Sequence, residues 1–186
     1  SHNLKGAKGE FELWFEKKKI GDFKVPVPGT HNALNATAAI VAGLVAGISF
    51  ATCRDGIAKF HGVDRRFQLK GEAAGISVYD YYGHHPTEVR ATLQAFREKL
   101  PDRRLVVLFP PPRSSRPPIC WHDFTNCFSQ CDELFITDIY AAGETPIEGI
   151  SAERLVKEIK HSSVRHFPRQ SDAVGLRAEL KSGDVF

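Results

Sequence analysis

From residue 67 onward, short apolar stretches alternate with longer stretches whose apolar positions recur at helical spacing. This alternation predicts an α/β domain with a mostly parallel sheet and helices on both faces. Residues 105–109 are apolar at every position, as expected of a central parallel strand. The predicted strands are 67–72, 76–81, 105–109, 133–139 and 164–167, and the predicted helices are 86–100, 119–130, 152–159 and 172–180. Residues 183–186 begin a further strand, so we expect this domain to continue beyond them.

The first sixty residues have a different pattern. Alternation predicts strands at 11–16 and 23–27, joined by a charged turn at 17–21. Pro28 and Gly29 then break the chain, and Thr30 is a suitable cap for a helix over 31–47. That helix is apolar on nearly all sides, so we expect it to be buried. A short helix over 54–60 ends at Gly62, and the charged stretch after it predicts a domain boundary, which divides the chain into 1–63 and 64–186.

Composition narrows the class of protein. The chain has 186 residues, of which 42% are hydrophobic and 25% charged, as in a soluble globular protein. Its net charge of +3 is too small to indicate a nucleic-acid partner, and no apolar run is long enough to predict a membrane span. The four cysteines match no common zinc pattern, and we interpret them as reduced core thiols of a cytoplasmic protein; three of them, Cys120, Cys127 and Cys131, have helical spacing within 119–131.

Three predicted loops follow strands of the sheet and should meet at its carboxyl edge, where α/β proteins bind ligands. The first contains Asp80, an acid suited to a ribose hydroxyl, and the His84-His85 pair before Pro86. His85 either caps the following helix or takes part in function, and Glu88 favours the helix dipole. The second is the loop 110–116, and the third is 140–145.

Arg113 and Arg116 in the second loop suit a carboxylate or phosphate, since a guanidinium binds such groups with two parallel hydrogen bonds; the alternative is that they are solvated loop charges. Two motifs are absent from the sequence: it has no Walker A loop and no G-x-G-x-x-G. We expect no metal site, because the paired histidines have no third ligand nearby.

Four segments together resemble the Mur ligases, the ATP-dependent amino-acid ligases of peptidoglycan biosynthesis. They are Pro28-Gly29-Thr30-His31-Asn32-Ala33-Leu34-Asn35-Ala36, Gly62-Val63-Asp64-Arg65-Arg66-Phe67, Tyr82-Gly83-His84-His85-Pro86-Thr87-Glu88 and Asp138-Ile139-Tyr140-Ala141-Ala142-Gly143-Glu144-Thr145-Pro146-Ile147. The last two are similar to the branch of the family that adds L-alanine. Departures from the family pattern are Tyr81, where a second aspartate is usual, and Pro110, Pro112 and Ser114 in the arginine loop.

The resemblance implies the C-terminal part of a three-domain enzyme. Residues 1–63 would be the tail of a central ATPase domain, with strands and a buried helix, and 64–186 a Rossmann-like C-terminal domain. The whole enzyme would join L-alanine to UDP-N-acetylmuramate through an acyl phosphate, using ATP and Mg²⁺. The N-terminal and central domains, with the P-loop and most Mg²⁺ ligands, would lie upstream, so this part alone would be inactive.

The resemblance also implies roles for individual residues. His31, Asn32 and Asn35 would lie near adenine, and Arg65 or Arg66 would reach the nucleotide from the hinge. The amino-acid side would be formed by Tyr82, His84, Arg113 and Arg116, with the arginines binding the L-alanine carboxylate. Three alternatives remain open: the related ligase that reuses murein tripeptide, a non-catalytic module that binds a small anion, and a non-catalytic scaffold domain.

Overall fold

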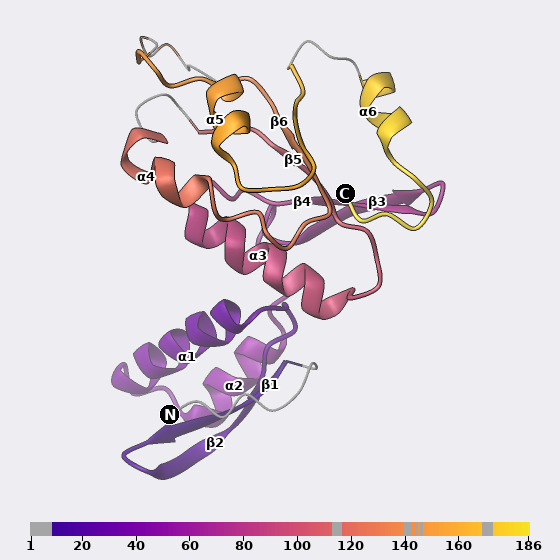
Figure 1. Cartoon of the computed structure of the whole chain (residues 1–186). Helices are drawn as coiled ribbons and strands as arrows, with labels where there is room; N and C mark the ends of the chain where they lie inside the picture. The colour runs from indigo at the N-terminus through magenta and orange to yellow at the C-terminus, as the bar shows by residue number, and fades with distance from the viewer. Residues whose placement is uncertain (1–8, 113–116, 140–142, 144, 146, 169–172) are drawn as a thin grey trace. The chain divides into compact units, whose positions relative to one another are not determined.

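A computed structural model of the chain describes residues 9–112, 117–139, 143, 145, 147–168 and 173–186. The chain divides into two compact units, one ending at Phe67 and one beginning at Gln68 (Figure 1). We call them unit 1 and unit 2 and describe each by itself. Within the described residues, every helix is too short or too polar to cross a membrane.

Unit 1 begins with an antiparallel hairpin of β1 (Glu10–Phe15) and β2 (Lys18–Lys24). The predictions of a long turn at 17–21 and a strand at 23–27 are wrong, because β2 already begins at Lys18 and ends at Lys24. The turn consists of Glu16 and Lys17, both with positive φ. A two-residue turn of this kind matches the twist of paired strands, so pairing starts at once with Phe15 opposite Lys18. The charged side chains that suggested a turn lie on the strand surface, where Lys19 forms ion pairs with Glu12 and Asp22.

Two helices complete unit 1, α1 (Thr30–Val45) and α2 (Phe50–Ala58). Thr30 is not the cap of α1, as expected, but its first residue; Gly29 occupies the capping position. The second helix starts before the predicted Arg54, because the hydroxyl of Ser49 accepts a hydrogen bond from Thr52 N–H and caps it there.

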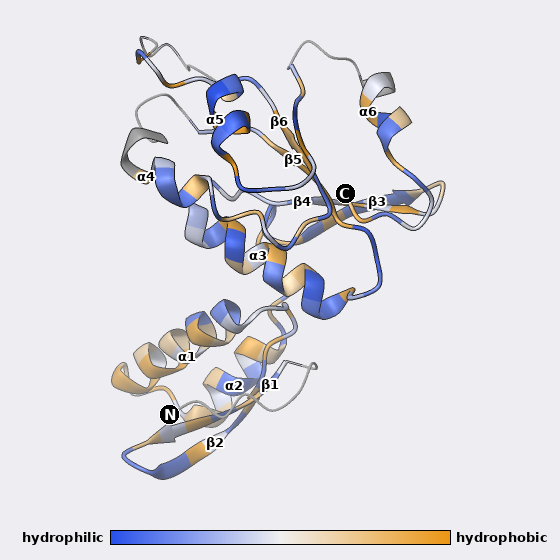
Figure 2. Cartoon of the chain, in the orientation of Figure 1, coloured by the Kyte–Doolittle hydropathy of each residue, from blue (hydrophilic) through white to orange (hydrophobic). Residues whose placement is uncertain are grey.

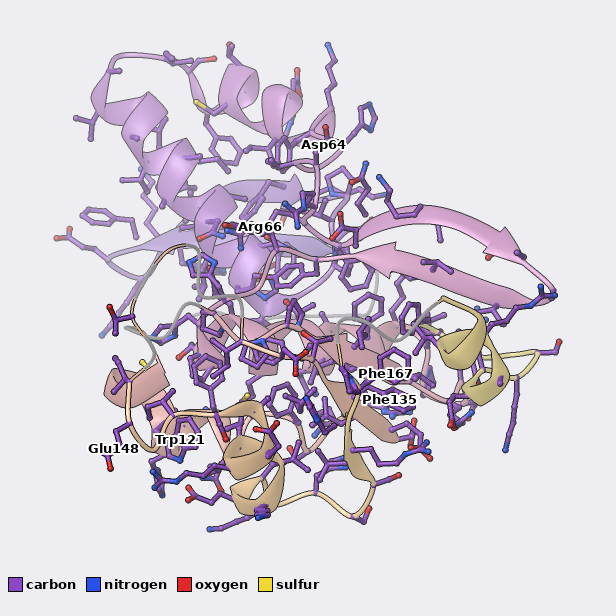
Figure 3. The ribbon with its side chains drawn as sticks, turned by 90° about the horizontal axis from the view of Figure 1, so that it is seen from above. Asp64, Arg66, Trp121, Phe135, Glu148 and Phe167 are labelled. Carbon is purple, nitrogen blue, oxygen red and sulfur yellow. The ribbon has the colours of Figure 1, made fainter. Side chains whose placement is uncertain are left out.

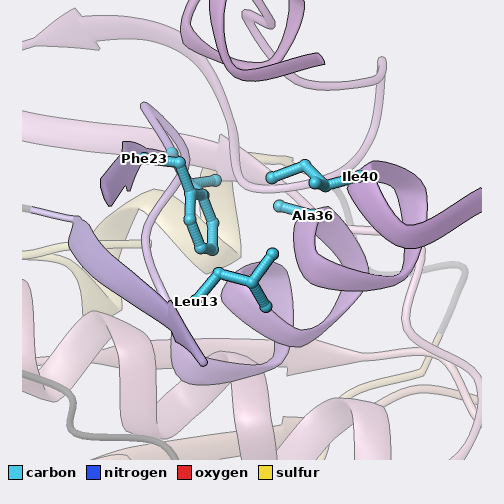
Figure 4. Packing of buried hydrophobic residues seen from close by; sticks show 5 residues of the cluster. Leu13, Phe23, Ala36 and Ile40 are labelled. Carbon is cyan, nitrogen blue, oxygen red and sulfur yellow. The ribbon is translucent and has the colours of Figure 1, made fainter. Parts of the chain in front are cut away.

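A small apolar cluster holds the hairpin and the helices of unit 1 together (Figure 4). Its buried members are Leu13, Phe23, Val25, Ala36 and Ile40. The expectation that α1 is buried all round is wrong for the described unit, since Val41 and Val45 are 46% and 85% exposed. The hairpin and α2 cover only one stripe of a helix that is apolar on most sides.

Unit 2 contains the expected succession of strands and helices. In chain order these are β3 (Gln68–Ala73), β4 (Ile76–Asp80), α3 (Pro86–Lys99), β5 (Val106–Phe109), α4 (Pro117–Phe124), β6 (Glu133–Ile136), α5 (Ala152–Glu158), β7 (Val164–His166) and α6 (Ala173–Glu179). β5, β6 and β7 pair in parallel, whereas β3 and β4 form an antiparallel hairpin. The predicted α/β class with a mostly parallel sheet is confirmed.

Three residues near the C-terminus join the hairpin to the parallel strands. Val185 bridges in parallel to Ser77 of β4 on one side and to Leu105, just before β5, on the other. Backbone hydrogen bonds run on both sides: Tyr79 N–H donates to Phe186 O at 2.6 Å, and Val106 N–H donates to Val185 O at 2.8 Å. The strand expected at 183–186 therefore occupies the middle of the sheet, and Val185 is buried.

Arg103 fastens this inserted segment. Its guanidinium donates to the carbonyl oxygens of Asp184 at 2.6 Å, Gly183 at 2.7 Å and Gly75 at 3.3 Å, and to the Ser77 hydroxyl at 2.9 Å. The planar cation thus reaches four acceptors at once, two of which, Asp184 O and Gly75 O, also accept backbone N–H groups.

Apolar side chains cover the sheet on the side of α3. Phe96 of α3 meets Tyr79 of β4 edge to face, with ring centroids 4.9 Å apart. Figure 2 shows hydrophobic colour concentrated on β5 and β6, while α3 alternates between polar and apolar positions. The fully buried side chains of β6 and the alternation on α3 account for this contrast, because β6 is covered on both faces and α3 on one.

The cysteines of unit 2 do not share one helix, as their spacing had suggested, because α4 ends at Phe124. Cys127 and Cys131 lie beyond it, free and buried, and burial raises the pKa of each thiol to about 12. They are therefore protonated, unreactive core side chains at neutral pH.

We predict that Arg103→Lys destabilises unit 2 by about 1–3 kcal/mol, because an ammonium group cannot serve four acceptors that surround a planar fork. Arg177→Lys, a matched change at an exposed position of α6, should alter the free energy of unfolding by less than about 0.5 kcal/mol. Urea unfolding followed by Trp121 fluorescence, in a Trp14→Phe background, measures unit 2 alone. Equal stability of the two variants would contradict the role given to Arg103.

Candidate substrate site at the carboxyl edge of the sheet

The turn between β4 and α3 is built around His85. Its backbone is extended, with φ −119° and ψ 139°, and its Nδ1 accepts a hydrogen bond from Thr87 N–H at 3.3 Å. Pro86 follows as the first helical residue, where its missing N–H costs nothing. The structural interpretation of His85 is confirmed, because its ring serves as the N-terminal cap of α3.

Glu88 in the first turn of α3 holds the residue before the cap. Its carboxylate accepts a hydrogen bond from His84 N–H at 3.4 Å and lies 3.8 Å from His84 Nδ1. A carboxylate in the first turn that reaches back to the preceding chain resembles a capping box, with histidine in place of serine or threonine. This contact fixes the backbone of His84 at the end of the strand.

The His84 ring is the polar centre of the turn. Its Nδ1 is buried and has no hydrogen-bond partner within the described residues. The ring lies beside that of Tyr82, with centroids 5.3 Å apart and planes inclined by 54°, and Tyr82 is 53% exposed. A buried ring nitrogen without a partner costs free energy that a bound polar group would offset. The structure thus brings together two of the predicted site residues.

Gly83, between them, lies against the ring of its neighbour Tyr81. A β-carbon at Gly83 would lie only 2.5 Å from Cε1 and 2.8 Å from Cδ1 of the Tyr81 ring. Tyr81 stands where the family resemblance leads us to expect an aspartate, so the ring takes up space above the turn. Asp80, proposed for the ribose, is the last residue of β4, half-buried and paired with Gln68 of β3.

The other predicted site residues lie elsewhere in the chain. His31, Asn32 and Asn35 occupy the first turns of α1 in unit 1, where the Asn32 amide donates to Pro28 O at 2.6 Å. Arg65 and Arg66 are exposed on the connection after α2, on which Figure 3 labels Arg66. Arg66 N–H donates to Val63 O, and Arg65 has a positive φ of 60°, so this connection turns sharply. Arg113 and Arg116 lie outside the described residues.

One group of side chains was missed in the sequence. His166, which ends β7, places Nε2 2.7 Å from Asp138 Oδ1 beyond β6, and Glu153 of α5 lies beside them. The expectation of no metal site considered only the paired histidines and overlooked this set. The signal that could have found it is a polar residue at the end of each neighbouring parallel strand.

Residues 65–186 match the family described as Mur ligase, glutamate ligase domain. A UDP-N-acetylmuramate–L-alanine ligase of Bdellovibrio bacteriovorus is 57% identical over 171 residues, which is 91% of this chain and 38% of that protein. The enzyme of the same name from Desulfosudis oleivorans is 43% identical over 183 residues, covering 96% of this chain and 40% of that protein. The chain spans about two fifths of the length of these curated relatives.

Solved structures show the same fold. A crystal structure of UDP-N-acetylmuramate-alanine ligase from Thermotoga maritima matches with a TM-score of 0.74 and 25% identity, over 100% of this chain and 40% of that one. A murein peptide ligase from Psychrobacter arcticus matches with a TM-score of 0.65 over 99% of this chain and 39% of that one; at 24% identity, it supports the fold alone.

We predict that His85→Ala lowers the stability of unit 2 by about 1 kcal/mol, because the Thr87 N–H loses its acceptor at the start of α3. His85→Asn should retain most of the stability, since asparagine is a favoured cap, and His122→Ala at an exposed position serves as the control. Thermal unfolding by circular dichroism distinguishes the three variants. If His85→Asn is as unstable as His85→Ala, the ring does more than cap the helix.

Proposed function

The chain belongs to the Mur ligase family, and on this premise we propose that it is the C-terminal part of a ligase that adds L-alanine to UDP-N-acetylmuramate in an ATP-dependent reaction. The observation that carries the proposal is the similarity to L-alanine ligases, which runs through both units rather than unit 2 alone. The identity of 57% and 43% to ligases named for L-alanine favours L-alanine over murein tripeptide as the substrate. The site of this reaction would be cytoplasmic.

In the proposed reaction, the muramate carboxylate is first converted to an acyl phosphate by the γ-phosphate of ATP. The amine of L-alanine then attacks the acyl carbon, the new amide bond forms and phosphate leaves with the electrons of the broken C–O bond. A ligase of this kind contributes chiefly by holding the amine at the correct distance and angle to the acyl carbon. The residues of this chain would supply that positioning.

Unit 2 would hold L-alanine at the turn after β4. His84 presents a buried ring nitrogen for which the described part of the chain supplies no hydrogen-bond partner, and Tyr82 forms an exposed aromatic wall beside it. Arg113 and Arg116 follow β5, whose end lies at the same edge of the sheet, and would bind the L-alanine carboxylate. Because α3 is capped at His85 and Glu88, this arrangement would stand on a rigid element before substrate binds.

The nucleotide side of the site would come from unit 1 and the hinge. α1 begins at Thr30 without a side-chain cap, and His31, Asn32 and Asn35 on its first turns offer hydrogen-bonding groups suited to adenine. Arg65 and Arg66 are exposed cations suited to phosphate, and Asp80 to a ribose hydroxyl. Magnesium would offset the charge of the phosphates, with most of its ligands outside these residues.

We further infer that residues 1–63 form the tail of a larger ATPase domain. Helix α1 and the turn after it expose apolar side chains that unit 1 leaves uncovered: Leu34, Val41, Leu44 and Val45 on the helix, and Ile48 after it. A contiguous apolar face of this kind usually packs against another element. In a complete ligase, the further residues that the curated relatives possess would supply such an element.

The proposal is tested by joining the chain to the residues of the Bdellovibrio ligase that it does not match. With UDP-N-acetylmuramate and ATP, the joined protein should release phosphate only when L-alanine is present, and mass spectrometry should show the alanyl product. Arg113→Ala should lower kcat/KM for L-alanine by about 10- to 100-fold, because a charge-assisted pair is lost. Arg177→Ala, on exposed α6, is the matched control.

Other outcomes distinguish the alternatives. A product formed with murein tripeptide but not with L-alanine would identify the related ligase. Binding of inorganic phosphate by the chain, lost in Arg113→Ala, together with a joined protein that makes no product, would indicate the small-anion module. An inactive joined protein without anion binding would indicate a scaffold domain.

A further inference from the structure

Asp138, Glu153 and His166 come from three different elements and place their side chains together. His166 Nε2 lies 2.7 Å from Asp138 Oδ1, and His166 Nδ1 lies 4.0 Å from Glu153 Oε1. One ligand atom from each residue can be chosen so that all lie within 4.8 Å of one another. The imidazole is largely covered, whereas the two carboxylates face solvent at 43% and 60% exposure.

The sheet topology explains why these residues meet. In the parallel pair of β6 and β7, Ile136 stands opposite His166, and Phe167 N–H donates to Ile136 O at 2.8 Å. Asp138 lies two residues beyond Ile136, so it reaches the same edge as His166. Helix α5 connects the two strands, and Glu153 lies in its first turn. The register of β6 and β7 and the crossover through α5 hold the three positions.

The chemistry of the group fits a cation. Two carboxylate side chains, those of Asp138 and Glu153, lie beside one imidazole. An imidazole with two carboxylates is a ligand set of zinc and other divalent transition metals, whereas Mg²⁺ prefers oxygen ligands throughout.

We propose that Asp138, Glu153 and His166 bind one divalent transition-metal ion, of which Zn²⁺ is the representative. Ligand bonds of about 2.0–2.2 Å require ligand atoms about 3.0–3.5 Å apart. The pair of Asp138 and His166 would open slightly and Glu153 would move inward, which its exposed side chain permits. The remaining coordination positions face solvent and would hold water.

The proposed metal ligand His166 lies on a strand far from the turn that carries His84. From β4 to β7 the sheet steps through residues 184–186, β5 and β6, which are four spacings of about 4.8 Å, or about 19 Å in total. A metal ion at His166 is therefore too far from the β4 strand end to contact a small amino acid bound at His84. Its effect would be local, tying the chain after β6 to α5 and β7.

Calorimetric titration of the chain with ZnCl₂ tests the proposal. We expect one Zn²⁺ per chain, and about tenfold or greater loss of affinity in both His166→Gln and Glu153→Gln. MgCl₂ at the same concentration should not compete. Zn²⁺ should also raise the melting temperature of the wild-type chain but not that of His166→Gln, because a ligand that binds only the folded state stabilises it.

The controls separate this site from other zinc ligands of the chain. His122→Gln changes an exposed histidine of unit 2, and Cys120→Ser removes a thiol 3.7 Å from His85 Nε2; neither should alter Zn²⁺ affinity. Circular dichroism checks that each variant is folded. Because Glu153 is exposed, Glu153→Gln should fold normally and still tests the site if His166→Gln unfolds. Unchanged binding in Glu153→Gln, loss of binding in Cys120→Ser, or no Zn²⁺ binding by the wild-type chain would overturn the proposal.

Discussion

The insertion of residues 184–186 between β4 and β5 is the contact on which unit 2 depends. Without it, the hairpin of β3 and β4 and the three-stranded parallel sheet have no backbone ladder in common. Arg103 binds the segment at its turn, and the buried carboxylate of Asp184 accepts from Arg104 at 3.0 Å and from Lys181 N–H at 2.8 Å. Arg103 thus binds the backbone of the inserted segment, and Arg104 binds its buried carboxylate.

The insertion of residues 184–186 also determines where the candidate site can lie. In the described residues, the inserted segment is what pairs β4 with the parallel strands. The turn that presents Tyr82 and His84 therefore lies at the same edge of the sheet as the loops after β5 and β6. The capping contacts of His85 and Glu88 then fix the turn locally. Long-range pairing places the site at the edge of the sheet, and short-range hydrogen bonds shape it.

Local patterns predicted much of this structure. The order of strands and helices in unit 2, the cap at His85 and the α/β class follow from periodicity and from helix-start chemistry, which act over a few residues. The hairpin turn at Glu16 and Lys17 was misplaced, since these residues adopt positive φ without the glycine or asparagine that usually marks such a turn. The one-sided burial of α1 was also missed, because burial depends on which elements are present to cover a helix.

What the sequence could not predict depends on distant residues. Nothing near Val185 indicates that it lies between Ser77 and Leu105, which are 80 or more residues away in the chain. The meeting of Asp138 with His166 likewise requires the register of β6 and β7. Pairing between residues so far apart in the chain leaves no local sequence pattern. Relatives of known structure, in contrast, show directly which strands pair.

Hydrogen exchange at individual backbone amides most directly tests whether the sheet that carries the site is one cooperative unit. Ser77, Tyr79 and Val106 each donate to a carbonyl of residues 184–186, while Leu134 and Thr137 donate within the parallel strands. If the inserted segment holds the sheet together, the first three amides should exchange as slowly as the other two, through the same global opening. Rapid exchange at Ser77, Tyr79 and Val106 with continued protection of Leu134 and Thr137 would contradict this account.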